Sequence, residues 1–144
     1  MLYLDTSVLA AYTLAREKEK KRFVATSALI EKIDKREYKA LTSFYSLLEL
    51  FTIAYENAPD FEVASQDAKD VLIEVLQTRV AITRMLTREE KLTRMPQFRL
   101  IKDSTDIPHA ISAFLFGCDK IVTYDEHFQA INHILPVVTP EDLL

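Results

Sequence analysis

The sequence predicts an α/β fold, a three-layer α/β/α sandwich in which helices cover both faces of a parallel sheet of about five strands. Short apolar segments alternate along the chain with longer segments of helical period, which is typical of parallel strands joined by helical crossovers. The chain has one glycine in 144 residues, too few for the many tight turns of a barrel or an all-β sandwich. Its length fits one core, so we expect residues 1–144 to form a single domain.

Five apolar segments have the length of buried strands. The first, at positions 2–4, ends abruptly at Asp5, Thr6 and Ser7, a sequence that suits a helix cap. The other four segments lie at 39–42, 80–82, 121–123 and 136–138.

Six helices are expected between and after these strands. The first begins near Val8, and the next two amphipathic stretches cover 23–33 and the segment from Ser43 towards Pro59. A fourth covers 63–76, and the fifth, at 87–95, has the spacing of a capping box. Thr105 is the expected cap of the sixth helix, and Gly117 is expected to end it.

The charge is distributed unevenly along the chain. The net charge of −4 argues against a protein that coats nucleic acid. Seven basic residues lie within 79–102 against two acids, whereas 103–144 holds seven acids and only Lys120. This separation suits a nuclease, which needs acids for a metal ion and bases for phosphates. A second basic run at 16–22 is equally consistent with a solvated helix face.

The sequence favours a soluble, cytoplasmic protein. It begins without a charged segment followed by an apolar signal core, and its longest apolar runs are far too short to span a bilayer. The one cysteine, Cys118, lies near Phe114 and Phe116, which favours a buried structural thiol over a reactive one.

Four acids are placed where a parallel sheet collects ligands, beyond the carboxyl ends of its strands. Asp5 follows the first strand, Asp125 follows the fourth after one residue, and Glu49 and Asp106 lie on helices at the same edge. Carboxylates are hard oxygen ligands that suit Mg²⁺ or Mn²⁺. We therefore expect Asp5, Glu49, Asp106 and Asp125 to form a metal-dependent catalytic site.

Each acid alone also has a structural explanation. Asp5 and Asp125 could cap the turns that follow them, and Asp106 could be an acid favoured by the helix dipole. Glu49 could close a capping box with Ser46, but the helix is expected to begin at Ser43, which leaves Glu49 in its interior among leucines. A charge among apolar residues is usually paired or bound to metal.

Four segments in this order resemble the motifs of the PIN domain family. They are Leu-Asp-Thr-Ser-Val-Leu at 4–9, Ser-Leu-Leu-Glu-Leu at 46–50, Thr-Asp-Ile-Pro-His-Ala at 105–110 and Ile-Val-Thr-Tyr-Asp-Glu-His-Phe at 121–128. The third departs from the usual pattern at Pro108, which the first turn of a helix tolerates. Positions 58–102 match the family only in their layout of helices and strands.

The resemblance implies a ribonuclease that uses Mg²⁺ or Mn²⁺ to cleave RNA. It assigns metal binding to Asp5, Asp106 and Asp125, makes Glu49 a ligand or a base that orients water, and gives Thr123 and Thr6 supporting hydrogen bonds. Many small members are VapC-like toxins, which implies a small antitoxin protein as a partner. We also expect a homodimer, and we expect the basic stretch, through Arg84, Arg88, Arg94 and Arg99, to hold the RNA substrate.

Three other functions are alternatives to this one. A phosphatase of the haloacid dehalogenase type needs a second aspartate where Ser7 stands, and a receiver domain needs an acidic pair that Leu4-Asp5 lacks. A non-catalytic PIN-like module that binds RNA or a protein stays open as the alternative. The three histidines lack zinc-binding spacing, so we expect them to have packing or surface roles. Between two neighbouring acids, we expect Asp106 rather than Asp103 to bind metal.

Overall fold

The computed structural model describes residues 1–144 and contains a five-stranded sheet in which every pair of neighbouring strands is parallel. This result confirms the predicted fold class. The strands are β1 (Leu2–Leu4), β2 (Ala40–Ser43), β3 (Ala81–Thr83), β4 (Lys120–Val122) and β5 (Val137–Val138), in the spatial order β3-β2-β1-β4-β5.

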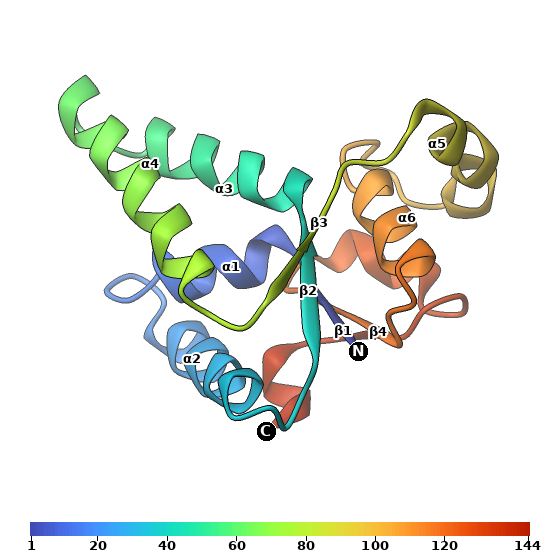
Figure 1. The fold of residues 1–144 in the computed structure, drawn as a ribbon, viewed down its shortest axis with the longest axis horizontal. Helices are drawn as coiled ribbons and strands as arrows, with labels where there is room; N and C mark the ends of the chain where they lie inside the picture. Colours follow the sequence, from blue (N-terminus) through green and yellow to red (C-terminus); the bar gives the residue numbers. More distant parts are fainter.

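The helices connect these strands in the predicted alternation (Figure 1). Three short 3₁₀ helices lie among them, two of which flank β5. None of the helices is long and apolar enough to cross a membrane. The α-helices are α1 (Thr6–Thr13), α2 (Lys20–Asp34), α3 (Phe44–Glu56), α4 (Phe61–Leu76), α5 (Arg88–Arg94) and α6 (Ile107–Leu115), and the 3₁₀ helices are η1 (Met95–Phe98), η2 (Glu126–Ile131) and η3 (Pro140–Leu143).

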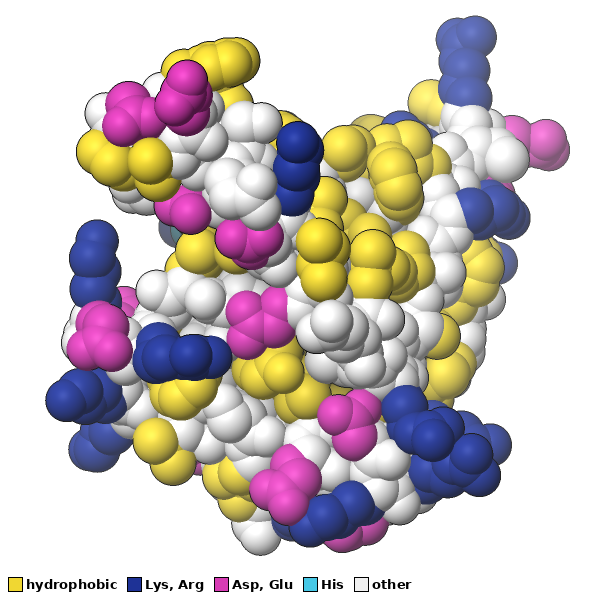
Figure 2. Space-filling view, turned by 60° about the vertical axis from the view of Figure 1, so that its left-hand side comes forward, with side chains coloured by type: hydrophobic (Ala, Val, Ile, Leu, Met, Phe, Trp, Pro, Cys, Tyr) yellow, Lys and Arg dark blue, Asp and Glu magenta, His cyan; other side chains and the backbone are white.

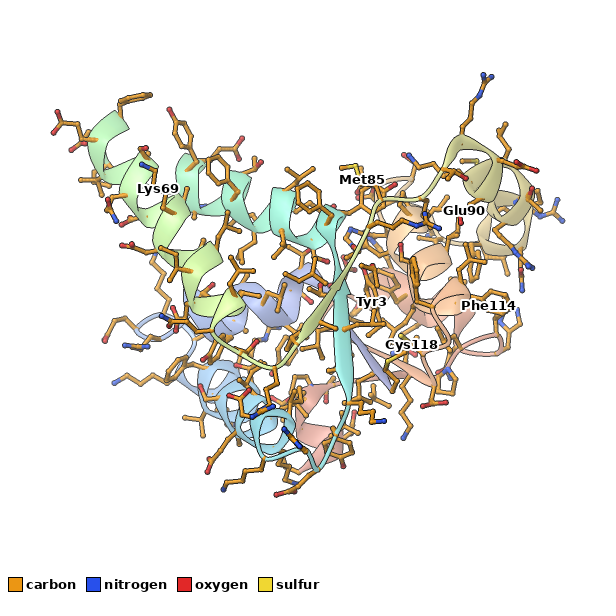
Figure 3. All side chains as sticks on the ribbon, viewed as in Figure 1. Tyr3, Lys69, Met85, Glu90, Phe114 and Cys118 are labelled. Atoms are coloured by element: carbon orange, nitrogen blue, oxygen red, sulfur yellow. The ribbon has the colours of Figure 1, made fainter.

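Side chains that alternate along the strands build one core on each face of the sheet. Leu2 and Leu4 pack with α1, α2, α3 and α4, whereas Tyr3 between them packs with α6, η1 and η2. Tyr3 lies between the sheet and α6 in Figure 3. Both faces of the central strand β1 are therefore buried, as expected of a parallel sheet covered by helices.

The strand order places a topological switch point at the centre of the sheet. The chain adds β2 and β3 on one side of β1, and β4 and β5 on the other. Crossovers on the two sides leave a crevice at the carboxyl ends of β1 and β4, where open parallel sheets bind ligands. Asp5 follows β1 and Thr123 follows β4, so both begin at this crevice.

Most predicted helix ends are confirmed, but the expected start of α6 is wrong. Ser43 caps α3, Thr87 and Glu90 form a capping box on α5, and Gly117 adopts a φ of 73° just after α6. Thr105, however, does not cap α6. Its backbone N–H and its hydroxyl both donate to Asp103 Oδ1, at 2.9 and 2.8 Å.

Asp103 therefore organises the turn before α6. Its carbonyl oxygen accepts the Asp106 N–H at 3.1 Å, which closes the turn over four residues. Asp106 then occupies the cap position of α6, and its side chain makes no capping hydrogen bond. The carboxylate of Asp106 is consequently free to face the edge of the sheet.

Candidate metal centre

Asp5 is the most firmly held acid of the site. Its side chain is buried, and its Oδ2 atom accepts hydrogen bonds from Ser7 N (3.2 Å), Ser7 Oγ (2.7 Å) and Thr123 Oγ1 (2.8 Å). Its own N–H donates to the carbonyl of Val122, which ties β1 to β4. Because all three donors reach Oδ2, the other oxygen, Oδ1, has no protein hydrogen bond and can face a ligand.

Thr123 links Asp5 to Asp125 across the crevice. Its hydroxyl donates to Asp5 Oδ2 and accepts the backbone N–H of Asp125 at 2.9 Å. The Asp125 carboxylate caps η2 by accepting the His127 N–H at 2.9 Å. Asp125 thus has the capping role that its position suggested, and it also lies beside the other acids.

Asp106 is the acid whose ionisation the site disfavours most. Asp106 is only 9% exposed to solvent. Burial is the largest cause, and together with the negative charges of Asp125 and Asp5 it raises the pKa of the Asp106 carboxyl to about 6, against a hydrogen bond from His127 that lowers the pKa. The charges of Asp5 and Asp125 therefore act on Asp106, which indicates that these three acids share one edge of the sheet.

His127 and Asp103 belong to the same cluster. The His127 Nδ1 atom lies 3.3 Å from Asp106 Oδ2 and 3.4 Å from Asp125 Oδ1, so this half-exposed histidine contacts two of the predicted metal ligands. Ligand atoms of Asp103, Asp106 and His127 all lie within 4.8 Å of one another. Asp103, which was expected to lie apart from the metal centre, is brought to it by the turn before α6.

Glu49 occupies a separate position at this edge. Its Oε2 atom accepts the Thr6 hydroxyl at 2.5 Å, and its Oε1 atom lies 2.9 Å from His109 Nε2. Burial alone would raise the pKa of Glu49. The hydrogen bond and charge of His109 and the hydrogen bond from Thr6 outweigh burial, so the pKa of Glu49 is lowered. Glu49 is thus held as a carboxylate, outside the tight group of Asp103, Asp106 and His127.

The residues of this edge fit a divalent cation. None of Asp5, Asp103, Asp106 and Asp125 forms an ion pair with lysine or arginine, and the only basic side chain within 4 Å of their carboxylates is that of His127. Crowded carboxylates repel one another unless a cation lies between them. Carboxylate oxygens are the protein ligands that suit Mg²⁺ and Mn²⁺.

Five side chains that contact the acids or their hydrogen-bond partners were given no such role by the sequence analysis: Tyr3, Ser7, Ser46, His109 and His127. His109 follows Asp106 at a spacing of three, which could have placed it near the site, but it faces Glu49 rather than Asp106. Ser7 could have been found from the Asp-Thr-Ser sequence, where a hydroxyl two residues after an aspartate often bonds it.

The arginines predicted to hold substrate lie on the α5 side of the molecule. Arg84 forms two hydrogen bonds with Glu90, at 2.7 and 2.9 Å, and Arg94 lies over the ring of Phe114. Arg88 and Arg99 are exposed. A basic residue outside this set, Arg22, lies closer to the acids.

Arg22 lies against the ring of Tyr124, with its guanidinium carbon 4.6 Å from the ring centroid. The two residues line one cavity of about 470 Å³ together with Ser7, Asp125, Glu126 and His127. Arg22 therefore offers a positive charge in the cavity that Asp125 and His127 also line.

Replacing Asp106 with Asn should stabilise the metal-free protein against urea at pH 7.5, by about 1–2 kcal/mol. The folded protein binds the Asp106 proton more tightly than the unfolded chain does, so wild-type stability falls as the pH rises from about 4 through 6. The variant has no carboxyl at this position and does not lose stability in this way. The difference in unfolding free energy between the variant and the wild-type protein should therefore shrink as the pH is lowered from 7.5 towards 4.

Urea unfolding in EDTA across this pH range measures the effect, with Asp70→Asn on the exposed face of α4 as the control. An advantage that does not change with pH, or a loss of stability at pH 7.5, would show that the carboxylates do not crowd Asp106.

The comparisons with known proteins agree with this fold. No curated protein matches the sequence. Among solved structures, the chain is similar to the toxin VapC20 of Mycobacterium tuberculosis, described as cleaving the sarcin–ricin loop, with 18% identity, a TM-score of 0.64 and coverage of 90% of this chain and 94% of that one.

Two further structures share the fold. VapBC-1 of nontypeable Haemophilus influenzae has 17% identity and a TM-score of 0.65, covering 98% of this chain and 99% of that one. PAE2754 of Pyrobaculum aerophilum has 18% identity and a TM-score of 0.61, covering 99% and 85%. A sequence model of the PIN domain matches residues 2–127 of this chain, and the protein therefore belongs to the PIN domain family.

Proposed function

We propose that the protein is a ribonuclease that hydrolyses RNA phosphodiester bonds with Mg²⁺ or Mn²⁺. The observation that carries the proposal is the set of acids at the carboxyl ends of β1 and β4 that no lysine or arginine neutralises. Asp5, Asp106 and Asp125 would hold the ion, and Asp103 and His127 are close enough to Asp106 to contribute.

The chain's own residues suit hydrolysis by water. A bound divalent ion supplies charge neutralisation at the phosphate and lowers the pKa of a water molecule. Glu49 is ionised and its side chain is 39% exposed, so it can accept a proton from an attacking water. The hydroxyls of Ser7 and Thr6 donate to Asp5 and Glu49 and so help to hold these two carboxylates in place.

The similar structures support a toxin of a toxin–antitoxin pair. One of them is a loop-cleaving toxin, and another is the assembly VapBC-1. The apolar side chains of Phe44, Leu48 and Phe51 are 38–46% exposed along α3, which suits burial against a protein partner. A small antitoxin as that partner, and a homodimer of this chain, stay predictions.

Asp5→Asn should abolish cleavage of single-stranded RNA without unfolding the protein. The amide keeps the size of the side chain but loses the charge that holds the metal ion. The loss in rate should exceed about 100-fold, the upper range for removing even an outer-shell partner of a metal ligand. EDTA should stop cleavage by the wild-type protein, and Mn²⁺ should restore it.

The control is the melting temperature and circular dichroism of the variant, which should match those of the wild-type protein or show higher stability. Full activity in Asp5→Asn, or cleavage that resists EDTA, would overturn the metal site. Binding of RNA without cleavage in any metal would instead identify a non-catalytic PIN module.

Binding of RNA should weaken as salt rises, and an Arg88→Ala/Arg94→Ala variant should show a shallower salt dependence. Each lost phosphate contact lowers the slope of log affinity against log salt by about 0.7 for single-stranded nucleic acid, so two should lower it by about 1.4. Lysine and arginine side chains form several separate groups on the face shown in Figure 2, with no continuous strip across it.

Fluorescence anisotropy on the Asp5→Asn background measures this binding without cleavage. A Lys39→Ala/Lys69→Ala variant removes two exposed charges outside the basic stretch, with Lys69 on α4 (Figure 3), and should keep the wild-type slope. Equal slopes for the wild-type protein and the Arg88/Arg94 variant would show that these arginines make no phosphate contacts.

A further inference from the structure

We propose that His109 is a positioning residue that fixes the carboxylate of Glu49 at the edge of the metal centre, and that Tyr3 and Ser46 in turn fix His109. The proposal rests on the nuclease function for its effect on catalysis. Its structural part concerns four side chains from β1, α3 and α6 and stands without it.

His109 is fully buried, yet it makes polar contacts on both sides of its ring. Its Nε2 atom lies 2.9 Å from Glu49 Oε1, and its Nδ1 atom lies 2.8 Å from the Tyr3 hydroxyl and 3.2 Å from Ser46 Oγ. The rings of Tyr3 and Tyr45 pack edge-on against it, with centroids 6.2 and 6.1 Å away. The imidazole therefore has a single orientation in this pocket.

The chemistry of the partners determines which nitrogen faces Glu49 as a donor. An ionised carboxylate only accepts hydrogen bonds, so Nε2 must carry a hydrogen and donate it to Glu49. On the other side, Nδ1 faces two hydroxyls, which can donate or accept. The ring is thus satisfied at both nitrogens, and turning it away would leave buried polar atoms without partners.

Glu49 needs such support because its side chain is long and 39% exposed on α3. His109 holds Oε1 and the Thr6 hydroxyl holds Oε2, so two donors from different elements fix the plane of the carboxylate. A carboxylate that orients water or a ligand must be held within a fraction of an ångström of its working position. His109 supplies one of the two points that hold it.

A packing role alone does not explain a histidine here. Its neighbours along α6, Ala110, Ile111 and Ala113, are apolar and fully buried, so packing alone would favour an apolar side chain such as leucine at this position. A histidine instead brings two polar nitrogens into this core, and all three of their partners are polar side chains that reach it from β1 and α3.

Three variants test the proposal by RNA cleavage under Mn²⁺. His109→Leu keeps an apolar core but removes the donor to Glu49, and should lower kcat about 10–100-fold with KM within about twofold. His109→Gln places an amide N–H near the position of Nε2 and should recover most of that loss. Tyr3→Phe removes the hydroxyl that contacts Nδ1 and also donates to Ser43 Oγ, but it leaves the Nε2 donor to Glu49 in place, so its loss in kcat should be smaller.

Tyr38→Phe is the matched control, because it removes a hydroxyl that bonds only the carbonyl of Leu143. It should leave both kinetic constants unchanged. Wild-type kcat in folded His109→Leu, or equal losses in the Leu and Gln variants, would overturn the positioning role.

Nitrogen NMR of the metal-free protein gives a readout that does not depend on activity. His109 should show a protected, low-field Nε2–H signal that moves upfield in Glu49→Gln and exchanges with solvent in Glu49→Ala. A hydrogen on Nδ1 alone would overturn the proposal. If the wild-type protein cleaves no RNA, the nuclease function fails, and this signal still decides whether His109 holds Glu49.

Discussion

One oxygen of Asp5 accepts three hydrogen bonds from Ser7 and Thr123, and the arrangement of the site depends on that carboxylate. Two of these donors follow Asp5 on α1 and the third follows β4, so the bonds join the two strands that flank the switch point. They fix the charge of Asp5 at the crevice while leaving its second oxygen free. The neighbouring acids must then accommodate a charge that cannot move away.

The neighbours respond to this fixed charge in different ways. Asp106 is buried beside Asp5 and Asp125, so its pKa rises to about 6 and its ionised form is disfavoured in the folded protein. Glu49 is relieved by donors of its own, Thr6 and His109, and stays ionised. One sheet edge thus holds a group of crowded acids that a cation would stabilise, and a separate carboxylate, that of Glu49, which has donors of its own. This difference supports separate roles for the group and for Glu49 in a metal-dependent reaction.

Much of the fold could be predicted because it depends on local patterns. Short apolar strands between amphipathic helices indicated the parallel sheet, and Ser43, Thr87 and Gly117 marked helix ends that the structure confirms. The positions of Asp5 and Asp125 followed from the rule that parallel strands place their carboxyl ends at one edge. These inferences need only the sequence near each element.

The remaining features depend on contacts between distant segments. Thr105 looked like a helix cap, but Asp103 captures both of its donors in a turn, and this choice between two equally suitable residues is not visible in sequence. His109 and His127 lack any ligand spacing because their partners come from other elements, Glu49 from α3 for the first and Asp106 across the crevice for the second. The turn and the two histidines complete the site, and all three are tertiary features.

The proposed function depends most on a divalent ion bound among the acids at the switch point. Diffraction from a crystal grown with Mn²⁺, recorded at the manganese absorption edge, tests this directly. We expect an anomalous peak with an Asp106 oxygen in its first or second coordination shell and Asp5 close by. A peak held by Asp103 with Asp106 turned to solvent, or no peak at this edge of the sheet, would contradict the account.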